Sequence, residues 1–244
     1  MTCKSSVLAV FVLAASSCID VQPGTSVEVE VAAVSTSAPR AELVNDYGYH
    51  IQLEQMYLVL SRVELVPCPG AQRASILREL LGVSVAYAHG VNTMTAWAVP
   101  NVLAPLADTA AVSIAALHPP AIAYCSLRLA LEAADADAER MPSEVDMNGL
   151  SMFVTGSYGL GESAPGVAFL YESFGASRMD LPIVDSAGNP APIELSADTL
   201  NVRLRVEIAY QQLFDGLTLY PGSFSTFGDV VLGQALTHVR VVVQ

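Results

Sequence analysis

The chain has 244 residues and a formal net charge of −13 at pH 7, from 24 acidic and 11 basic side chains. This balance excludes the basic surface on which nucleic-acid binding depends, so we expect no nucleic-acid partner. Lys4 is the only lysine, which excludes mechanisms that need a lysine amine, such as Schiff-base chemistry.

Residues 1–17 have the three parts of an export signal. Lys4 provides a positive charge, an apolar run follows at 7–15, and small residues lead to Cys18. The run is shorter than the ~20 residues of a membrane-spanning helix, which is typical of a cleaved signal peptide. The stretch AASSC resembles a lipoprotein cleavage site, and we predict that Cys18 carries a lipid. The alternative is ordinary cleavage near residues 14–16, which leaves Cys18 as a spare thiol.

The predicted lipid assigns the protein to the cell envelope, in the periplasm or on the outer membrane, with the membrane as a partner through the anchor. Residues 18–25 are polar and turn-rich, which suits a tether between membrane and domain. The remaining residues, 26–244, are long enough for a single domain with a substantial core.

Alternation of apolar and polar residues recurs along this domain and predicts strands. In chain order, the clearest segments are 26–34, 49–67, 121–134, 199–210 and 238–243. Turn residues separate them, which indicates an all-β fold, and we predict an antiparallel β-sandwich. Helical spacing adds a short helix within 73–90 and another within 227–238, both in loops.

The segment 49–67 changes phase twice. Ile51 and Leu53 have one parity, residues 56–60 have the other, and residues 63–65 return to the first. One inserted residue moves every later side chain to the opposite face of a strand. We therefore predict a bulge near residues 54–55 and a second break near residues 61–62.

Two cysteines remain in the domain once Cys3 and Cys18 are assigned to the signal and the anchor. Cys68 follows a predicted strand, and Cys125 lies within another. In an oxidising compartment such a pair most simply forms a disulfide. The alternatives are two buried thiols or a metal-bound thiolate.

Histidines are the candidate metal ligands, since imidazole is a common ligand for copper and zinc. None has the spacing of a known metal motif, so a site would have to be assembled from distant positions. The strongest candidate is His89, because Gly90 permits a tight backbone and Met94 offers a soft thioether nearby. We predict a metal site of His89, His50 and Met94, with copper as the cofactor. His118 and His238 are better read as loop and edge histidines.

Other chemistry has weaker support. The acidic run at 132–146 contains Asp135, Asp137 and Glu139, which could hold calcium, but a solvated hairpin loop is the better interpretation. The stretch GESAPG departs from the G-x-S-x-G nucleophile motif. We therefore predict that the protein is not an enzyme.

Several segments together, YHIQLEQMYLVLSRVELVPC, AYAHG, PPAIAYCSLRLAL, LSMFVTGSY and LNVRLRVEIAYQQLFDGL, resemble uncharacterised lipoproteins of myxobacteria. More distantly, the chain is similar to periplasmic copper-binding proteins associated with methanobactin systems. This resemblance implies a β-sandwich that holds copper with histidine and a modified tryptophan and works with a dihaem partner. On this chain, only His89 and Trp97 match those ligands.

Our leading functional hypothesis is an exported, lipid-anchored protein that binds a ligand without catalysis, with copper capture or delivery as its role. The alternative is a cell-surface structural or protein-interaction module that recognises a protein partner in the envelope. A module of this kind predicts an exposed apolar patch, which we expect within residues 94–107.

Overall fold

The computed structural model describes residues 25–34, 41–70, 94–161, 166–196, 199, 201–219, 222–223 and 225–244. Cys18, His89 and the helix expected within 73–90 lie outside the described residues. The all-β prediction is confirmed, because strands dominate and one α-helix accompanies them in the described ranges. The strands are β1 (Ser26–Ala33), β2 (Glu42–Val44), β3 (Tyr49–Pro67), β4 (Ala96–Trp97), β5 (Asn101–Leu103), β6 (Val112–Leu117), β7 (Ala123–Leu131), β8 (Met152–Leu160), β9 (Val167–Ser173), β10 (Ser177–Val184), β11 (Ile193–Glu194), β12 (Asn201–Ile208), β13 (Gly222–Ser223) and β14 (Val239–Val243).

Two helical elements lie near the C-terminus. They are the 3-10 turn η2 (Tyr210–Gln212) and the helix α2 (Ser225–Ala235). The prediction of a short helix within 227–238 is therefore confirmed, although the helix begins and ends slightly earlier than expected.

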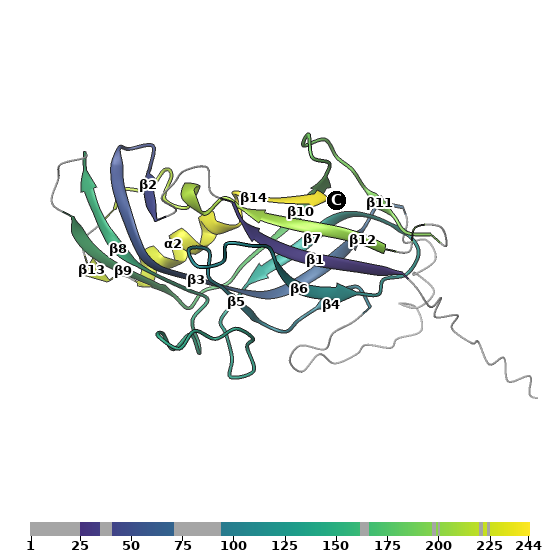
Figure 1. The fold of residues 1–244 in the computed structure, drawn as a ribbon, viewed down its shortest axis with the longest axis horizontal. Helices are drawn as coiled ribbons and strands as arrows, with labels where there is room; N and C mark the ends of the chain where they lie inside the picture. The colour runs from purple at the N-terminus through teal and green to yellow at the C-terminus, as the bar shows by residue number, and fades with distance from the viewer. Residues whose placement is uncertain are drawn as a thin grey trace, which may run out of the picture.

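β3 is the longest strand and pairs with five others. This 19-residue strand pairs with β8 and then with β7 along one edge. Along its other edge it pairs with β2, β5 and β4 in turn. Figure 1 shows it running through both ends of the fold. The two predicted phase changes are confirmed, because the register shifts between Leu53 and Gln55 and again between Leu60 and Arg62.

The strands form one curled sheet with the order β13-β9-β8-β3-β7-β10-β14-β12-β1-β6. β10 makes it continuous, because it pairs first with β7 and then with β14. The curl brings β6 against β4. The predicted sandwich is not confirmed, and the sheet is mixed rather than wholly antiparallel. β1 runs parallel to β12, β10 to β14, and β13 to β9.

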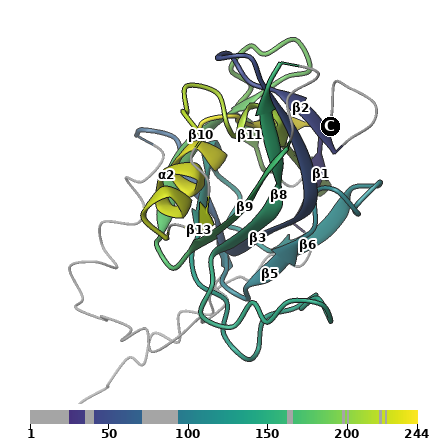
Figure 2. The ribbon, with the colours of Figure 1, turned by 90° about the vertical axis from the view of Figure 1, so that its left-hand side faces the viewer.

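The sheet has two halves with different interiors. The curled half consists of β1, β4, β6, β7, β10, β11, β12, β14 and β3 from Leu60 onward, and β5 pairs with β3 where the two halves meet. The wing consists of β2, β8, β9, β13, α2 and β3 up to Leu58, and Figure 2 looks onto it, with α2 beside β9. Buried aliphatic side chains fill the curled half, among them Val29, Leu127, Leu204, Val206 and Val241. Aromatic rings fill the wing, in a chain of contacts through Tyr158, Phe169, Tyr171, Phe214 and Phe227.

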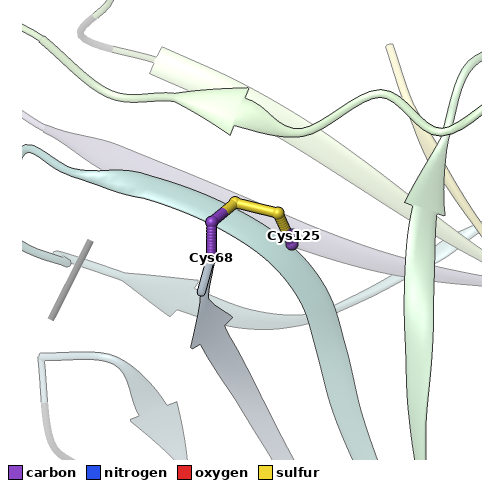
Figure 3. Close-up of a disulfide and its surroundings, with 2 residues drawn as sticks. All are labelled: Cys68 and Cys125. Carbon is purple, nitrogen blue, oxygen red and sulfur yellow. A yellow bond between two sulfur atoms is a disulfide. The ribbon is translucent and has the colours of Figure 1, made fainter. Parts of the chain in front are cut away.

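The predicted disulfide is confirmed (Figure 3). Cys68 lies just after β3 and Cys125 lies on β7, with their Cα atoms 4.8 Å apart. The backbone N–H of Cys68 also donates to the carbonyl of Ala123. The bridge therefore joins the end of one strand to its neighbour inside the curled half.

Candidate functional site

The predicted metal ligands His50 and Met94 do not share a site. His50 lies near the start of β3, in the wing. Met94 precedes β4, and Ala96 of β4 pairs with Glu64 near the end of β3. At ~3.3 Å per residue, about 45 Å of strand separates the two positions. His89 lies outside the described residues.

The structure instead brings Met94 beside His118. The curl of the sheet carries the end of β6 to the residues before β4, where the backbone N–H of His118 donates to the carbonyl of Met94 at 3.1 Å. The Met94 side chain is 45 % exposed, and His118 is exposed as well. This pairing was missed in the sequence, because no local pattern shows that β4 and β6 are neighbours.

Thr25 orients the His118 ring. Nδ1 of His118 lies 3.3 Å from the backbone carbonyl oxygen of Thr25, and the Thr25 hydroxyl donates to the carbonyl of Pro119 at 2.8 Å. When Nδ1 carries the proton and donates to that carbonyl, Nε2 keeps a lone pair available to a ligand. This is how protein carbonyls commonly position metal-binding histidines.

In the described parts of the chain, no three His, Cys, Asp or Glu side chains converge as a metal site. His238 lies just before β14 and is half-buried. The calcium alternative for Asp135, Asp137 and Glu139 likewise gains no support, because these residues form no such group.

The acidic segment 132–148 is a loop whose charged side chains are exposed, as expected, but its backbone also folds back onto the sheet. Its backbone pairs with residues 100–102 through Glu139 and closes on itself between Ala134 and Asn148. Ala134 and Met147 of the segment form a small second core on the outer face of the sheet with Val59 of β3, Val102 of β5 and Leu150. Tyr57 packs on this core, where burial and then the nearby charge of Glu144 raise the pKa of its hydroxyl.

The apolar patch expected within residues 94–107 is largely buried, which corrects that prediction. β4 and β5 pair with β3, so Ala96, Val102 and Leu103 are at most 2 % exposed. Three strongly exposed apolar side chains lie instead together at one end of the wing. Val44 ends β2, Tyr47 lies in the turn between β2 and β3, and Leu160 ends β8, and they are 56–67 % exposed. Phe174, which follows β9, is a further exposed apolar side chain of the wing.

Among the described residues, none of the helices has the length and apolar character that a membrane crossing requires. The resemblance to copper-binding proteins stays a prediction, as does the lipid on Cys18. No protein-family model matches the chain, and no curated protein or solved structure is significantly similar to it.

Proposed function

We propose that this chain is exported, is anchored in the cell envelope through lipid on Cys18, and binds copper without catalysis, for capture or delivery. The observation that supports the copper site is the juxtaposition of Met94 and His118 at the seam where the sheet curls onto itself. A thioether and an imidazole are the soft and intermediate ligands that suit Cu(I). His89 remains a predicted third ligand.

Metal loading tests this proposal. The protein, prepared without its signal and with Cys18→Ser, is exposed to Cu(I), Cu(II) and Zn(II), desalted and analysed for metal. We expect near-stoichiometric copper in the parent protein and loss of at least tenfold in affinity with His118→Ala or Met94→Leu. His89→Ala tests the third ligand in the same assay.

Two histidine variants serve as controls for this experiment. His238→Ala and His50→Ala remove imidazoles that lie away from Met94, so both should retain copper. Absence of retained copper in the parent protein would overturn the proposal, and so would equal losses in all four histidine variants, which would indicate non-specific binding.

Anchoring is tested separately. Replacement of Cys18 by Ser should abolish incorporation of labelled fatty acid and move the protein from the membrane fraction to the soluble fraction. A chain that stays in the membrane fraction with Cys18→Ser would contradict the lipid anchor.

The second candidate, a protein-interaction module, is favoured by the exposed apolar end of the wing. Cross-linking in intact cells should then give one discrete adduct with an envelope protein. The double variant Tyr47→Ser with Leu160→Ser should lose this adduct. Val230→Ser, which changes an exposed side chain on α2, should keep it.

A further inference from the structure

A groove of about 370 Å³ lies between the acidic segment and the sheet, and neither Met94 nor His118 lines it. It is lined by Ser61 and Arg62 of β3, by residues 98–100, and by Glu132, Ala133, Asp135 and Asp137 of the acidic segment. Its volume is within the range of small-molecule sites. The groove is independent of the proposed copper site.

The second bulge of β3 shapes one side of the groove. Leu60 pairs with Leu131 and Arg62 with Ala130, so Ser61 is the residue without a cross-strand partner. Its hydroxyl lies 3.1 Å from both the carbonyl oxygen of Ala130 and a carboxylate oxygen of Glu132. Ser61 is only 7 % exposed, whereas Glu132 is exposed, so the contact connects a buried hydroxyl to a carboxylate on the surface of the groove. Bulges often re-aim side chains next to functional sites.

The opposite side is fixed before any ligand arrives. The N–H of Val102 donates to the carbonyl of Glu139 at 3.0 Å, and the N–H of Glu139 donates to the carbonyl of Pro100 at 2.8 Å. Arg140 adds an ion pair with Asp108 at 2.6 Å. A preformed groove loses little conformational entropy when it binds.

The charges in the groove are mostly negative. Glu132, Asp135 and Asp137 line it, and the one cationic side chain, Arg62, already contacts Glu64 at 3.2 Å. Beside the carboxylates lies an apolar stretch of Ala98, Val99 and Pro100. Carboxylates spread along a partly apolar groove complement a ligand whose positive charges are also spread along methylene groups, whereas a metal ion needs oxygens that converge on one point.

We propose that this groove binds a small linear aliphatic polyamine, with its ammonium groups against Glu132, Asp135 and Asp137 and its methylene chain along Val99 and Pro100. The strongly acidic composition of the chain assists by attracting cations to the surface. This inference goes beyond the copper proposal and does not depend on it.

Calorimetric titration of the full-length chain with spermidine, in mild detergent, tests the inference. We expect saturable binding of one equivalent that weakens as salt is raised. The triple variant Glu132→Gln, Asp135→Asn, Asp137→Asn should bind at least tenfold more weakly. These amides keep an acceptor oxygen for the contacts that Glu132 makes with Ser61 and that Asp135 makes with the N–H of Asp137.

A charge-matched control distinguishes binding by the carboxylates of the groove from general attraction to the negative charge of the protein. Glu54→Gln, Glu194→Gln and Asp215→Asn remove the same charge elsewhere and should leave the affinity unchanged. Val99→Trp, which fills the groove from its apolar side, should also weaken binding tenfold while circular dichroism stays that of the parent protein.

Three results would overturn the inference. They are the absence of saturable binding, equal weakening by the two triple variants, and tighter binding of calcium that displaces spermidine through the same carboxylates. The last outcome would assign the groove to a divalent cation.

Discussion

The curled half and the wing share one sheet but fill their interiors differently. In the curled half, β1, β12, β14, β10 and β7 each lie between two other strands, and the buried side chains include aliphatic ones such as Val29 and Leu204 together with Tyr124. In the wing, no second layer of strands covers the inner face among the described residues, and aromatic rings and α2 cover it instead. The row of ring contacts and the helix packed on β9 therefore distinguish the wing from the curled half, although one continuous core spans both.

The two halves also differ in what holds their ends. The curled half carries the disulfide. The wing relies on buried polar contacts, in which Ser173 accepts from the Ser151 hydroxyl at 3.1 Å and donates to the Asp229 carboxylate of α2. The predictions below test this difference, beginning with the largest expected effect.

Removal of the disulfide should have the largest effect. Cys68→Ala with Cys125→Ala opens a loop with a sequence separation of 57 residues. Loop-closure entropy then predicts that the free energy of unfolding falls by about 4 kcal/mol. Urea unfolding of the parent and double-variant proteins measures this change. An unchanged midpoint would show that pairing between the strands alone holds the curled half.

Gly228→Ala should destabilise the wing by about 3 kcal/mol, because α2 packs directly on the backbone of β9. A Cβ atom on Gly228 would lie 1.9 Å from the carbonyl oxygen of Glu172. Gly233, on the same helix, has open space around it. Gly233→Ala should therefore raise stability by about 0.5–1 kcal/mol through helix propensity. Similar thermal midpoints for the two variants would contradict this docking of α2.

Asn45→Ala should lower the free energy of unfolding by about 2 kcal/mol. The buried Asn45 side chain connects the β2–β3 turn to the segment after η2 through hydrogen bonds. Its amide donates to the carbonyls of Phe214 and Leu217 at 3.1 and 3.0 Å, and its oxygen accepts from the N–H groups of Tyr47 and Tyr49. Asp46→Ala is the matched control, because it removes one exposed hydrogen bond to Gly216. Denaturant unfolding should rank the two variants in this order.

Asp180→Asn should have the smallest effect on stability. It removes the ion pair between Asp180 and Arg128, which is exposed to solvent and should contribute less than about 1 kcal/mol. A hydrogen bond from Arg128 is the main cause that lowers the pKa of Asp180 below its ordinary value of 3.8. A lowered folded-state pKa gives stability that is present above the unfolded pKa and is lost as the pH falls through the folded one. The difference between parent and variant should therefore be constant near neutral pH and shrink below about pH 4. A difference that persists at pH 2 would contradict the ion pair as its cause.

Local patterns in the sequence predicted where individual strands lie, but they did not predict which strands pair with one another. The parity changes along β3 located both bulges, and the alternation at 199–210 predicted that Leu204, Val206 and Ile208 face inward, as they do. A period of two residues reports which face of a strand is buried, but it does not identify the strand beside it. The parallel pairing of β1 with β12 joins residues 175 positions apart, such as Ser26 and Asn201, and has no local signal of this kind.

The candidate sites, too, could be predicted from the sequence only where they did not depend on which strands are neighbours. The disulfide could be predicted because two cysteines in an oxidising compartment leave one simple pairing. The neighbouring positions of Met94 and His118 depend on the curl of the whole sheet, and the groove depends on how the acidic segment folds back over β3 and β5. Both arrangements combine residues from distant segments, so no single segment of the sequence could predict them.

The position of β1 has a mechanical consequence. β1 is paired along its full length with β12, from Ser26 opposite Asn201 to Ala33 opposite Ile208, and β6 pairs with its other edge. Tension on the chain before Thr25 would act along the axis of β1, and so would load the hydrogen bonds of both ladders in shear. Pulling from this end should therefore give one abrupt rupture at high force, rather than gradual peeling of the strand.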